Sequence, residues 1–376
     1  MASKSALSSN PVRDLLTRLA APVFALGLFA SCQSVSVPPE QISVTPAPDP
    51  LPAPVTTQPW LMATASVSDL EQTARFFREI GGYETVFEGP LDPSELRALG
   101  LPNDASGEVR TLRAPRSDSG YVRLVRFDNA GRKAPTRPGA RAWDTGCFWS
   151  FMVRANDLEA VYDDAIAMGW GTETPIAPLS FNGSELNIVV FKGPDGLQVQ
   201  AYERLNRPIP EGFTDFERLS RPFNIMQMTR DREAVRLLME DVLGFERVWY
   251  GTPYVDDEPT LMPLGIPQNL TTSVPYKAGI FTPQTQSLYG RMEYIEIDGL
   301  DGFDYTDRCR APNLGWLSVT YPVDVADRAK QMIEARGWAI EQDVYASTRP
   351  SFGALRVFSI KAPDGAMIEF AERTQE

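Results

Sequence analysis

The stretch GPDGLQVQAYER at 193–204 returns, with the same spacing, as APDGAMIEFAER at 362–373. Each copy is a Pro-Asp-Gly turn followed by a run in which apolar and polar residues alternate. Such alternation is typical of a β-strand with one buried face. Two copies in one chain indicate an internal duplication, and the duplication predicts a fold built from repeated units.

The same order of segments occurs four times around these two copies. Each unit has a strand, a polar turn with an acidic residue, an amphipathic helix that closes at Gly and an aromatic residue, and three further strand-like runs. Asn or Asp before a helix suits its N-cap, and Gly after it suits its C-terminal stop. The strand-to-helix segments lie at 61–83, 148–170, 223–245 and 316–338.

The four units pair by shared motifs. The first and third carry LGLP at 99–102 and LGIP at 264–267, whereas the second and fourth carry the Pro-Asp-Gly ending. The order is therefore A-B-A'-B', with a boundary near 204–221, where prolines and a glycine interrupt any regular pattern.

This arrangement resembles the vicinal oxygen chelate superfamily, which includes glyoxalase I, extradiol dioxygenases and bleomycin-resistance proteins. The resemblance covers 60–374 and rests on VSDLE at 67–71, LGF at 243–245 and the Pro-Asp-Gly endings. It implies an α+β fold of four βαβββ modules paired into two tandem domains, 60–206 and 218–374. Each domain is expected to curve around a shared cleft.

Composition excludes several kinds of chemistry. The chain has 376 residues, 43% of them hydrophobic, and a formal net charge of -13, which argues against binding nucleic acid. It contains no histidine. Ser-His-Asp triads, H-E-x-x-H zinc sites and two-histidine iron sites are therefore excluded.

The N-terminal region predicts export. Basic residues precede a short apolar run at 19–30, which is typical of a signal peptide over 1–31. LFASC at 28–32 resembles a bacterial lipoprotein signal, which implies lipidation of Cys32, and Gln33 implies retention at the periplasmic face of the outer membrane. A plain secretory signal, with a periplasmic or secreted protein, is the alternative. The segment 32–59 is rich in proline and predicts an extended linker.

The resemblance also points to positions for a metal ion, which in this family usually lies among His and Glu on the first and last strands of paired modules. The first-strand positions fall on Met62, Ser150, Asn224 and Leu317. The last-strand glutamate position falls on Gln200 and Glu369.

These residues predict no metal site. Met62, Ser150 and Gln200, with Arg123 or Val125, give the first domain no anionic ligand. In the second domain Asn224, Glu369 and one of Glu293 or Glu296 form an oxygen set that suits only weak binding of Mg²⁺ or Ca²⁺. The alternative for Glu369 is a buried carboxylate satisfied by hydrogen bonds or by an arginine.

Two functions follow from the resemblance. The first is an envelope-anchored, metal-independent protein that binds a small, partly aromatic or oxygenated molecule. Its predicted ligand-binding residues are Asn224, Gln200, Ser150 and Arg123. A scaffold role, in which the linker presents the body to another envelope protein, is a further alternative.

The second function is a lyase- or isomerase-type enzyme whose site lies in the second domain. A buried carboxylate with a raised pKa can perform acid-base chemistry without histidine. The predicted catalytic residues are Glu369 with Glu296 or Glu293 beside it.

Two cysteines remain besides Cys32. Cys147 and Cys309 each stand shortly before the first strand of a second module. This placement allows a symmetric bridge between the halves in an oxidising periplasm, and two small buried thiols are the alternative.

Overall fold

A computed structural model describes residues 50–139, 141–181, 183–284 and 287–374. Pro50–Glu376 forms one compact unit. The predicted signal peptide, the lipidated Cys32 and most of the predicted linker lie outside the described residues. None of the helices in the described ranges is long and apolar enough to cross a membrane.

The predicted order of elements is confirmed in all four modules. The first contains β1 (Met62–Ser66), α1 (Leu70–Arg75) continued by a π-helical turn (Phe76–Ile80), β2 (Glu84–Pro90), α2 (Pro93–Ala98), β3 (Ser106–Arg113) and β4 (Tyr121–Asp128). The second contains β5 (Phe148–Arg154), α3 (Leu158–Ala167), β6 (Gly171–Thr172), β7 (Ala177–Phe181), β8 (Ser184–Lys192) and β9 (Gln198–Arg204).

The second half repeats this order. The third module contains β10 (Asn224–Thr229), α4 (Arg232–Arg236) with a π-helical turn (Leu237–Val242), β11 (Glu246–Tyr250), β12 (Tyr276–Thr282) and β13 (Arg291–Ile297). The fourth contains β14 (Gly315–Pro322), α5 (Ala326–Ala335), β15 (Gln342–Arg349), β16 (Gly353–Lys361) and β17 (Met367–Arg373). The predicted α+β class of four βαβββ modules is thereby confirmed.

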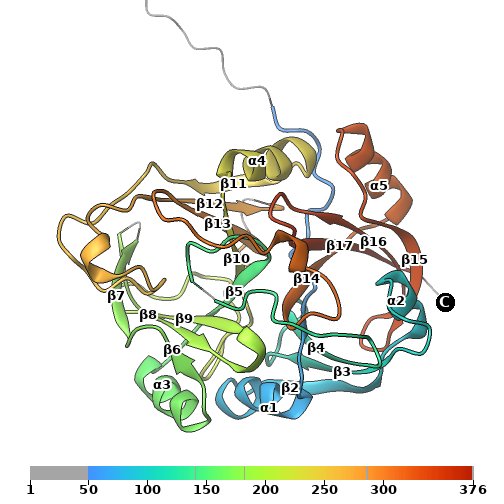
Figure 1. Cartoon of the computed structure of the whole chain (residues 1–376), viewed down its shortest axis with the longest axis horizontal. Coiled ribbons are helices and arrows are strands. Elements are labelled where there is room, and N and C mark those ends of the chain that lie inside the picture. Colours follow the sequence, from blue (N-terminus) through green and yellow to red (C-terminus); the bar gives the residue numbers. More distant parts are fainter. Residues whose placement is uncertain (1–49, 140, 182, 285–286, 375–376) are drawn as a thin grey trace, which may run out of the picture. The chain divides into compact units, whose positions relative to one another are not determined.

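The strands form two mixed sheets (Figure 1). The first sheet has the order β15-β16-β17-β14-β1-β4-β3-β2, so it joins the first and fourth modules. The second has the order β11-β12-β13-β10-β5-β9-β8-β6, with β7 on β8, so it joins the second and third modules. In each sheet the first strands of the two modules pair antiparallel, β1 with β14 and β5 with β10.

This pairing differs from the expectation that the two modules of each half curve around a shared cleft, because consecutive modules lie in different sheets. Each half of the duplication, 60–206 and 218–374, contributes one module to each sheet. The reason is that all four first strands carry a similar apolar pattern, so the pattern alone does not select a partner. Contacts between strands far apart in sequence select it instead.

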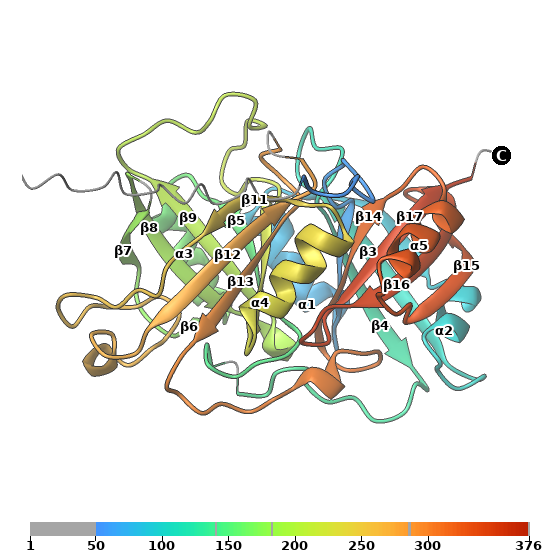
Figure 2. The same ribbon diagram turned by 90° about the horizontal axis from the view of Figure 1, so that it is seen from above.

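One apolar core joins the backs of both sheets. The rings of Phe151 on β5 and Trp316 on β14 stack with their centroids 4.8 Å apart. The ring of Phe76, after α1, stacks on that of Trp170, after α3, at 4.0 Å. Helices α1 and α3 lie on one side of this core and α4 and α5 on the other (Figure 1). The opposite face of each sheet points away from this core. The second sheet lies on the left and the first sheet on the right in Figure 2.

A disulfide also links the two sheets. Cys147 precedes β5 and Cys309 precedes β14, and their sulfur atoms are bonded across a sequence separation of 162. Both residues are buried. Of the two alternatives for these cysteines, the bridge is the one that the structure contains.

Candidate functional site

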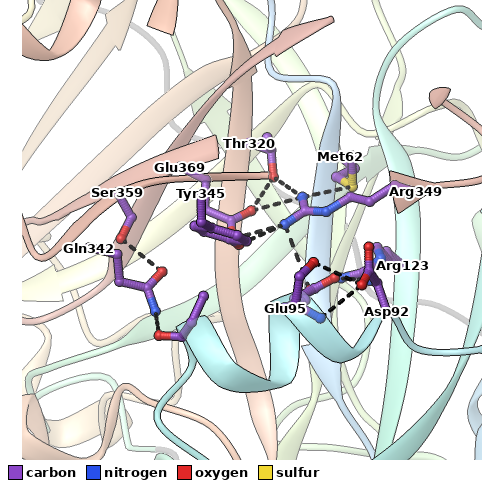
Figure 3. Close-up of polar contacts among 12 residues, drawn as sticks. Met62, Asp92, Glu95, Arg123, Thr320, Gln342, Tyr345, Arg349, Ser359 and Glu369 are labelled. Carbon is purple, nitrogen blue, oxygen red and sulfur yellow. Dashed lines mark hydrogen bonds and ion pairs between the residues drawn. The ribbon is translucent and has the colours of Figure 1, made fainter. Parts of the chain in front are cut away.

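On the outward face of the first sheet, an arginine stands where the resemblance placed a metal ion. Both oxygens of Glu369 on β17 accept hydrogen bonds from the guanidinium of Arg349 on β15, at 3.1 and 3.2 Å. The Thr320 hydroxyl donates to the same carboxylate at 2.6 Å. The guanidinium lies 3.8 Å from the sulfur of Met62, the predicted first-strand position (Figure 3).

A second ion pair completes this buried network. Glu95, on the short helix α2, accepts two hydrogen bonds from Arg123 on β4, both at 2.7 Å. A nitrogen of Arg349 lies 3.7 Å from the same carboxylate (Figure 3). All four charged side chains are at most 5% exposed. Positive and negative groups therefore alternate along the network. Helix α2, which carries Glu95, covers this part of the sheet face.

The network does not fit a metal ion. Two guanidinium groups would repel a cation, and both Glu369 oxygens already accept hydrogen bonds. Burial alone would raise the pKa of Glu369, but Arg349, together with Thr320 and Arg123, outweighs burial and the pKa is lowered. Arg123, predicted as a ligand-binding residue, is engaged with Glu95. The alternative of a carboxylate satisfied by an arginine describes this site.

The outward face of the second sheet carries a different polar cluster. Each of the four central strands contributes one predicted residue: Ser150 on β5, Gln200 on β9, Asn224 on β10 and Glu293 on β13. The Gln200 amide nitrogen donates to the Ser150 hydroxyl, and its carbonyl oxygen accepts from Tyr202 at 2.7 Å. The Asn224 amide nitrogen donates to Glu293 at 2.8 Å.

The sequence analysis named these four residues as candidates but divided them between two clefts. Ser150 and Gln200 were expected beside Met62 and Arg123, and Asn224 was expected beside Glu369. The sheet pairing brings all four together and leaves Glu369 in the other sheet. The oxygen set proposed for weak Mg²⁺ or Ca²⁺ binding, which combined Asn224 with Glu369, is consequently not assembled.

Glu293 has unusual electrostatics for a glutamate. Burial raises its pKa to about 7, and the hydrogen bond from Asn224 only partly opposes this rise. Asn224 is neutral, and among the described residues no cation forms an ion pair with this carboxyl group. The side chain nevertheless keeps partial exposure. The carboxyl group is therefore poised near neutral pH either to donate or to accept a hydrogen bond.

Apolar side chains surround this cluster. Met152 and Met226 lie on the same sheet face and are each 1% exposed. The long connection between β11 and β12 packs over the same face and completes its wall through Met262, Leu264 and Ile266. A polar floor with methionine and aliphatic walls suits a small organic ligand with a few polar groups.

Glu296 does not belong to either cluster, which corrects its prediction as a cleft residue. Its carboxylate accepts from the Arg232 backbone nitrogen at the start of α4, at 3.0 Å, and from Lys277 at 2.7 Å. Residues three apart on a strand point to opposite faces, so Glu296 lies on the helix side of β13 while Glu293 faces outward.

The second cluster also lacks the ligands of a tightly bound transition metal. Glu293 is its one carboxylate, and Ser150, Gln200 and Asn224 are neutral. Among the residues that the structure describes, no three His, Cys, Asp or Glu side chains come together as a metal-binding group. The donor set therefore does not fit the usual His and Glu site of the resemblance.

Sequence reasoning missed three residues of these sites. Arg349 and Glu95 lie outside the motifs that the modules share, on β15 and on an extra helix, so the duplication gave no signal for them. Tyr202 was within reach, because it stands two residues after Gln200 on an alternating strand and must share its face.

Comparison with known proteins supports the fold. No family model matches the chain, and no curated protein matches it. Among solved structures, a glyoxalase I mutant from Zea mays covers 84% of this chain and 94% of its own, with a TM-score of 0.56 and 14% identity. Glyoxalase I from Zea mays covers 84% and 92%, with a TM-score of 0.54 and 13% identity. The chain thus has the vicinal oxygen chelate fold.

Proposed function

We propose that this chain binds a small organic molecule on the outward face of its second sheet, without a metal ion. The observation that carries the proposal is the Glu293 carboxyl group, whose pKa is raised to about 7 and whose one hydrogen-bond partner in the described chain is Asn224. The Asn224 side-chain oxygen is buried without a partner among the described residues. Buried polar atoms of this kind favour a site that a ligand completes.

The first sheet offers less to a ligand. The two carboxylates of its buried network, Glu369 on β17 and Glu95 on helix α2, are each paired with arginine. A ligand there would have to break a buried ion pair, which costs about 3–5 kcal/mol. The second sheet requires no such cost, so the ligand-binding role is assigned to Ser150, Gln200, Asn224 and Glu293.

A thermal-shift screen of chelator-treated protein tests this proposal. Small aromatic and oxygenated molecules are added at neutral pH to the wild type and to Glu293→Gln. A ligand that binds at the polar cluster is expected to raise the Tm of the wild type by about 2–5 °C and that of the variant by less. Glu159→Gln, an exposed carboxylate on α3, is the matched control. Binding that requires a divalent cation, or that ignores Glu293→Gln, would contradict the proposal.

An acid-base enzyme is the second candidate, and the raised pKa of Glu293 favours it. A general base works best when its pKa lies near the working pH. The lowered pKa of Glu369 suits a general base less well, so we assign this role to Glu293. Turnover of a lyase or isomerase substrate that survives Glu293→Gln would count against it.

We also propose that the protein is exported and anchored through a lipid on Cys32, at the periplasmic face of the outer membrane. The predicted signal peptide supports this location, and so does the disulfide, because disulfides persist in oxidising compartments. Incorporation of labelled palmitate into the wild type but not into Cys32→Ser is the expected result. Equal labelling of both would contradict the anchor.

A further inference from the structure

A basic pocket of about 230 Å³ opens beside the polar cluster of the second sheet. It lies where β5 and β9 end and the linker to the third module begins. Three arginines, Arg154, Arg204 and Arg207, line it together with Tyr202 and Asn156. In a chain with a formal net charge of -13, three arginines at one pocket need an explanation.

Arg154 is held in place but not neutralised. Its guanidinium lies over the rings of Phe223, at 4.4 Å, and Tyr202, at 5.6 Å. Two of its nitrogens, Nε and Nη1, are buried and have no hydrogen-bond acceptor among the described residues. Burial lowers the pKa of Arg154 to about 10, with a further contribution from Arg204. A guanidinium that is stacked on aromatic rings and has two nitrogens without an acceptor suits an anion as its partner.

The charged groups around Arg154 also favour an anion at this pocket. In the described part of the chain, none of the three arginines has a carboxylate within ion-pair distance, and Arg204 donates only to the Pro208 carbonyl at 3.1 Å. Arg207 helps to lower the pKa of Arg204, after burial.

The two acidic residues at the pocket are committed elsewhere. Asp157 caps α3 by accepting from the Ala160 nitrogen at 3.2 Å. Glu203 accepts from the Leu158 nitrogen at 3.4 Å and from Asn187 at 3.3 Å. Neither forms an ion pair with the arginines of the pocket.

Tyr202 connects this pocket to the polar cluster. Its ring lies under Arg154, and its hydroxyl donates to Gln200 at 2.7 Å. Alternation along β5 and β9 places Ser150, Arg154, Gln200 and Arg204 on one face of the sheet. The sheet therefore presents, in order, a basic end, a polar floor and apolar walls.

We propose that the ligand of this protein is an organic anion, whose carboxylate or similar oxyanion binds Arg154 and Arg204 while its apolar body lies over the floor near Glu293. This inference rests on the proposed function and narrows the ligand class. The complementary arrangement of charge and apolar surface favours amphipathic acids over neutral molecules.

Two probes with one ring system test the proposal: 2-naphthoate, which is anionic, and 2-naphthamide, which is neutral. Binding to the purified protein is measured by isothermal titration at constant ionic strength, because added salt screens exposed charges. Wild type is expected to bind naphthoate at least about 10-fold more tightly than naphthamide.

Substitutions locate the binding. Arg154→Met keeps the apolar stem and removes the charge, and it is expected to weaken naphthoate binding by about 10- to 100-fold while leaving naphthamide unchanged. Arg310→Met, an exposed arginine in another loop, is the matched control. Equal affinity for both probes, no saturable naphthoate binding at millimolar concentration, or insensitivity to Arg154→Met would overturn the inference.

Glu293→Gln separates this inference from the proposed function. If naphthamide binds as tightly as naphthoate and Glu293→Gln changes the affinity for both, the cleft is used but the anion preference is wrong. If naphthoate depends on Arg154 and ignores Glu293→Gln, the basic pocket binds anions and the proposed cleft is wrong.

Discussion

Two carboxyl groups on last strands of their modules, Glu293 and Glu369, carry opposite electrostatics. Burial would raise the pKa of both. At Glu369 the guanidinium of Arg349, with Thr320 and Arg123, outweighs burial and lowers the pKa, whereas at Glu293 the neutral Asn224 does not, and the pKa rises to about 7. Glu369 in the first sheet therefore stays ionised near neutral pH, whereas Glu293 in the second sheet gains or loses its proton there.

Glu293 is expected to make folding stability depend on pH. Its pKa is about 7 in the folded protein and near 4.5 when exposed, so the folded state binds more protons between these values. The free energy of unfolding should therefore fall as the pH rises from about 4.5 to about 7, by at most about 3 kcal/mol because the side chain keeps partial exposure. Urea unfolding at several pH values, with wild type and Glu293→Gln compared, measures this slope.

The difference between the pH profiles of wild type and Glu293→Gln gives the contribution of the Glu293 carboxyl group. Burial also raises the pKa of Asp364, to about 6, and this group contributes a slope of the same sign in both proteins. Above about pH 5, the free energy of unfolding should depend less on pH in Glu293→Gln than in wild type. In Glu159→Gln it should have the same pH dependence as in wild type. Parallel profiles for wild type and Glu293→Gln would show that the carboxyl group titrates normally.

Removing Arg349 is expected to be severe. Arg349→Met leaves Glu369 and Glu95 buried without their shared cation, and the loss of a buried partner costs about 3–5 kcal/mol. Arg356→Met is the matched control on the next strand, because Arg356 forms half-exposed ion pairs with Asp327 and Glu372. Its expected cost is about 0–1 kcal/mol. Equal losses in urea unfolding would contradict the structural role of Arg349.

Residue types could be predicted at the sites, but their partners could not. The shared endings placed Gln200 and Glu369 at corresponding positions, and strand alternation placed their side chains on a sheet face. Arg349 gave no signal, since it lies at the end of β15, outside the shared motifs. A carboxylate's role depends on such a partner, so the sequence left both a catalytic and a structural role open for Glu369.

Helix ends show how far local chemistry determines an element. Asp69 caps α1, and its side chain accepts from the backbone nitrogens of Glu71 at 2.9 Å and Gln72 at 3.0 Å. Helix α5 begins differently: Val325 is its N-cap and gives no side-chain hydrogen bond, and Glu372 accepts from the Ala326 nitrogen at 2.8 Å instead. Similar sequence patterns therefore precede helices that are capped in different ways. The cap of α1 is a neighbouring residue, whereas the cap of α5 comes from a residue distant in the sequence.

This difference predicts unequal effects of two equivalent substitutions. Asp69→Ala is expected to lower the free energy of unfolding by about 1 kcal/mol, because two backbone donors lose their acceptor. Asp324→Ala, before α5, should change it by less than about 0.5 kcal/mol, because Asp324 does not cap that helix. Chemical denaturation of both variants provides the comparison, and equal losses would mean that the cap at Asp69 adds nothing specific.

At the scale of the whole molecule, the duplication determined the modules but not their partners. Sequential elements are usually neighbours, which favoured pairing the first module with the second. The structure pairs it with the fourth, through β1 and β14, and the stacked rings of Phe151 and Trp316 join the two sheets across a shared core. Such contacts between distant segments produce no periodic pattern in the sequence.

The pairing predicts that neither half of the duplication folds alone. A fragment of residues 60–206 lacks β14 for β1 and β10 for β5, so both of its central strands would expose an edge and the shared core would be open. It should show no cooperative unfolding in urea, and neither should residues 207–376. Mixed under oxidising conditions, the two fragments are expected to regain a cooperative transition.

The disulfide supplies an independent readout of this complementation. Cys147 lies in the first fragment and Cys309 in the second, so native pairing should cross-link the two chains. A non-reducing gel is expected to show the joined species, and Cys147→Ala should abolish it while leaving the cooperative transition detectable. A monomeric fragment 60–206 that unfolds cooperatively by itself would instead show that consecutive modules can share a sheet, and the cleft residues would then have to be reassigned along with the sheets.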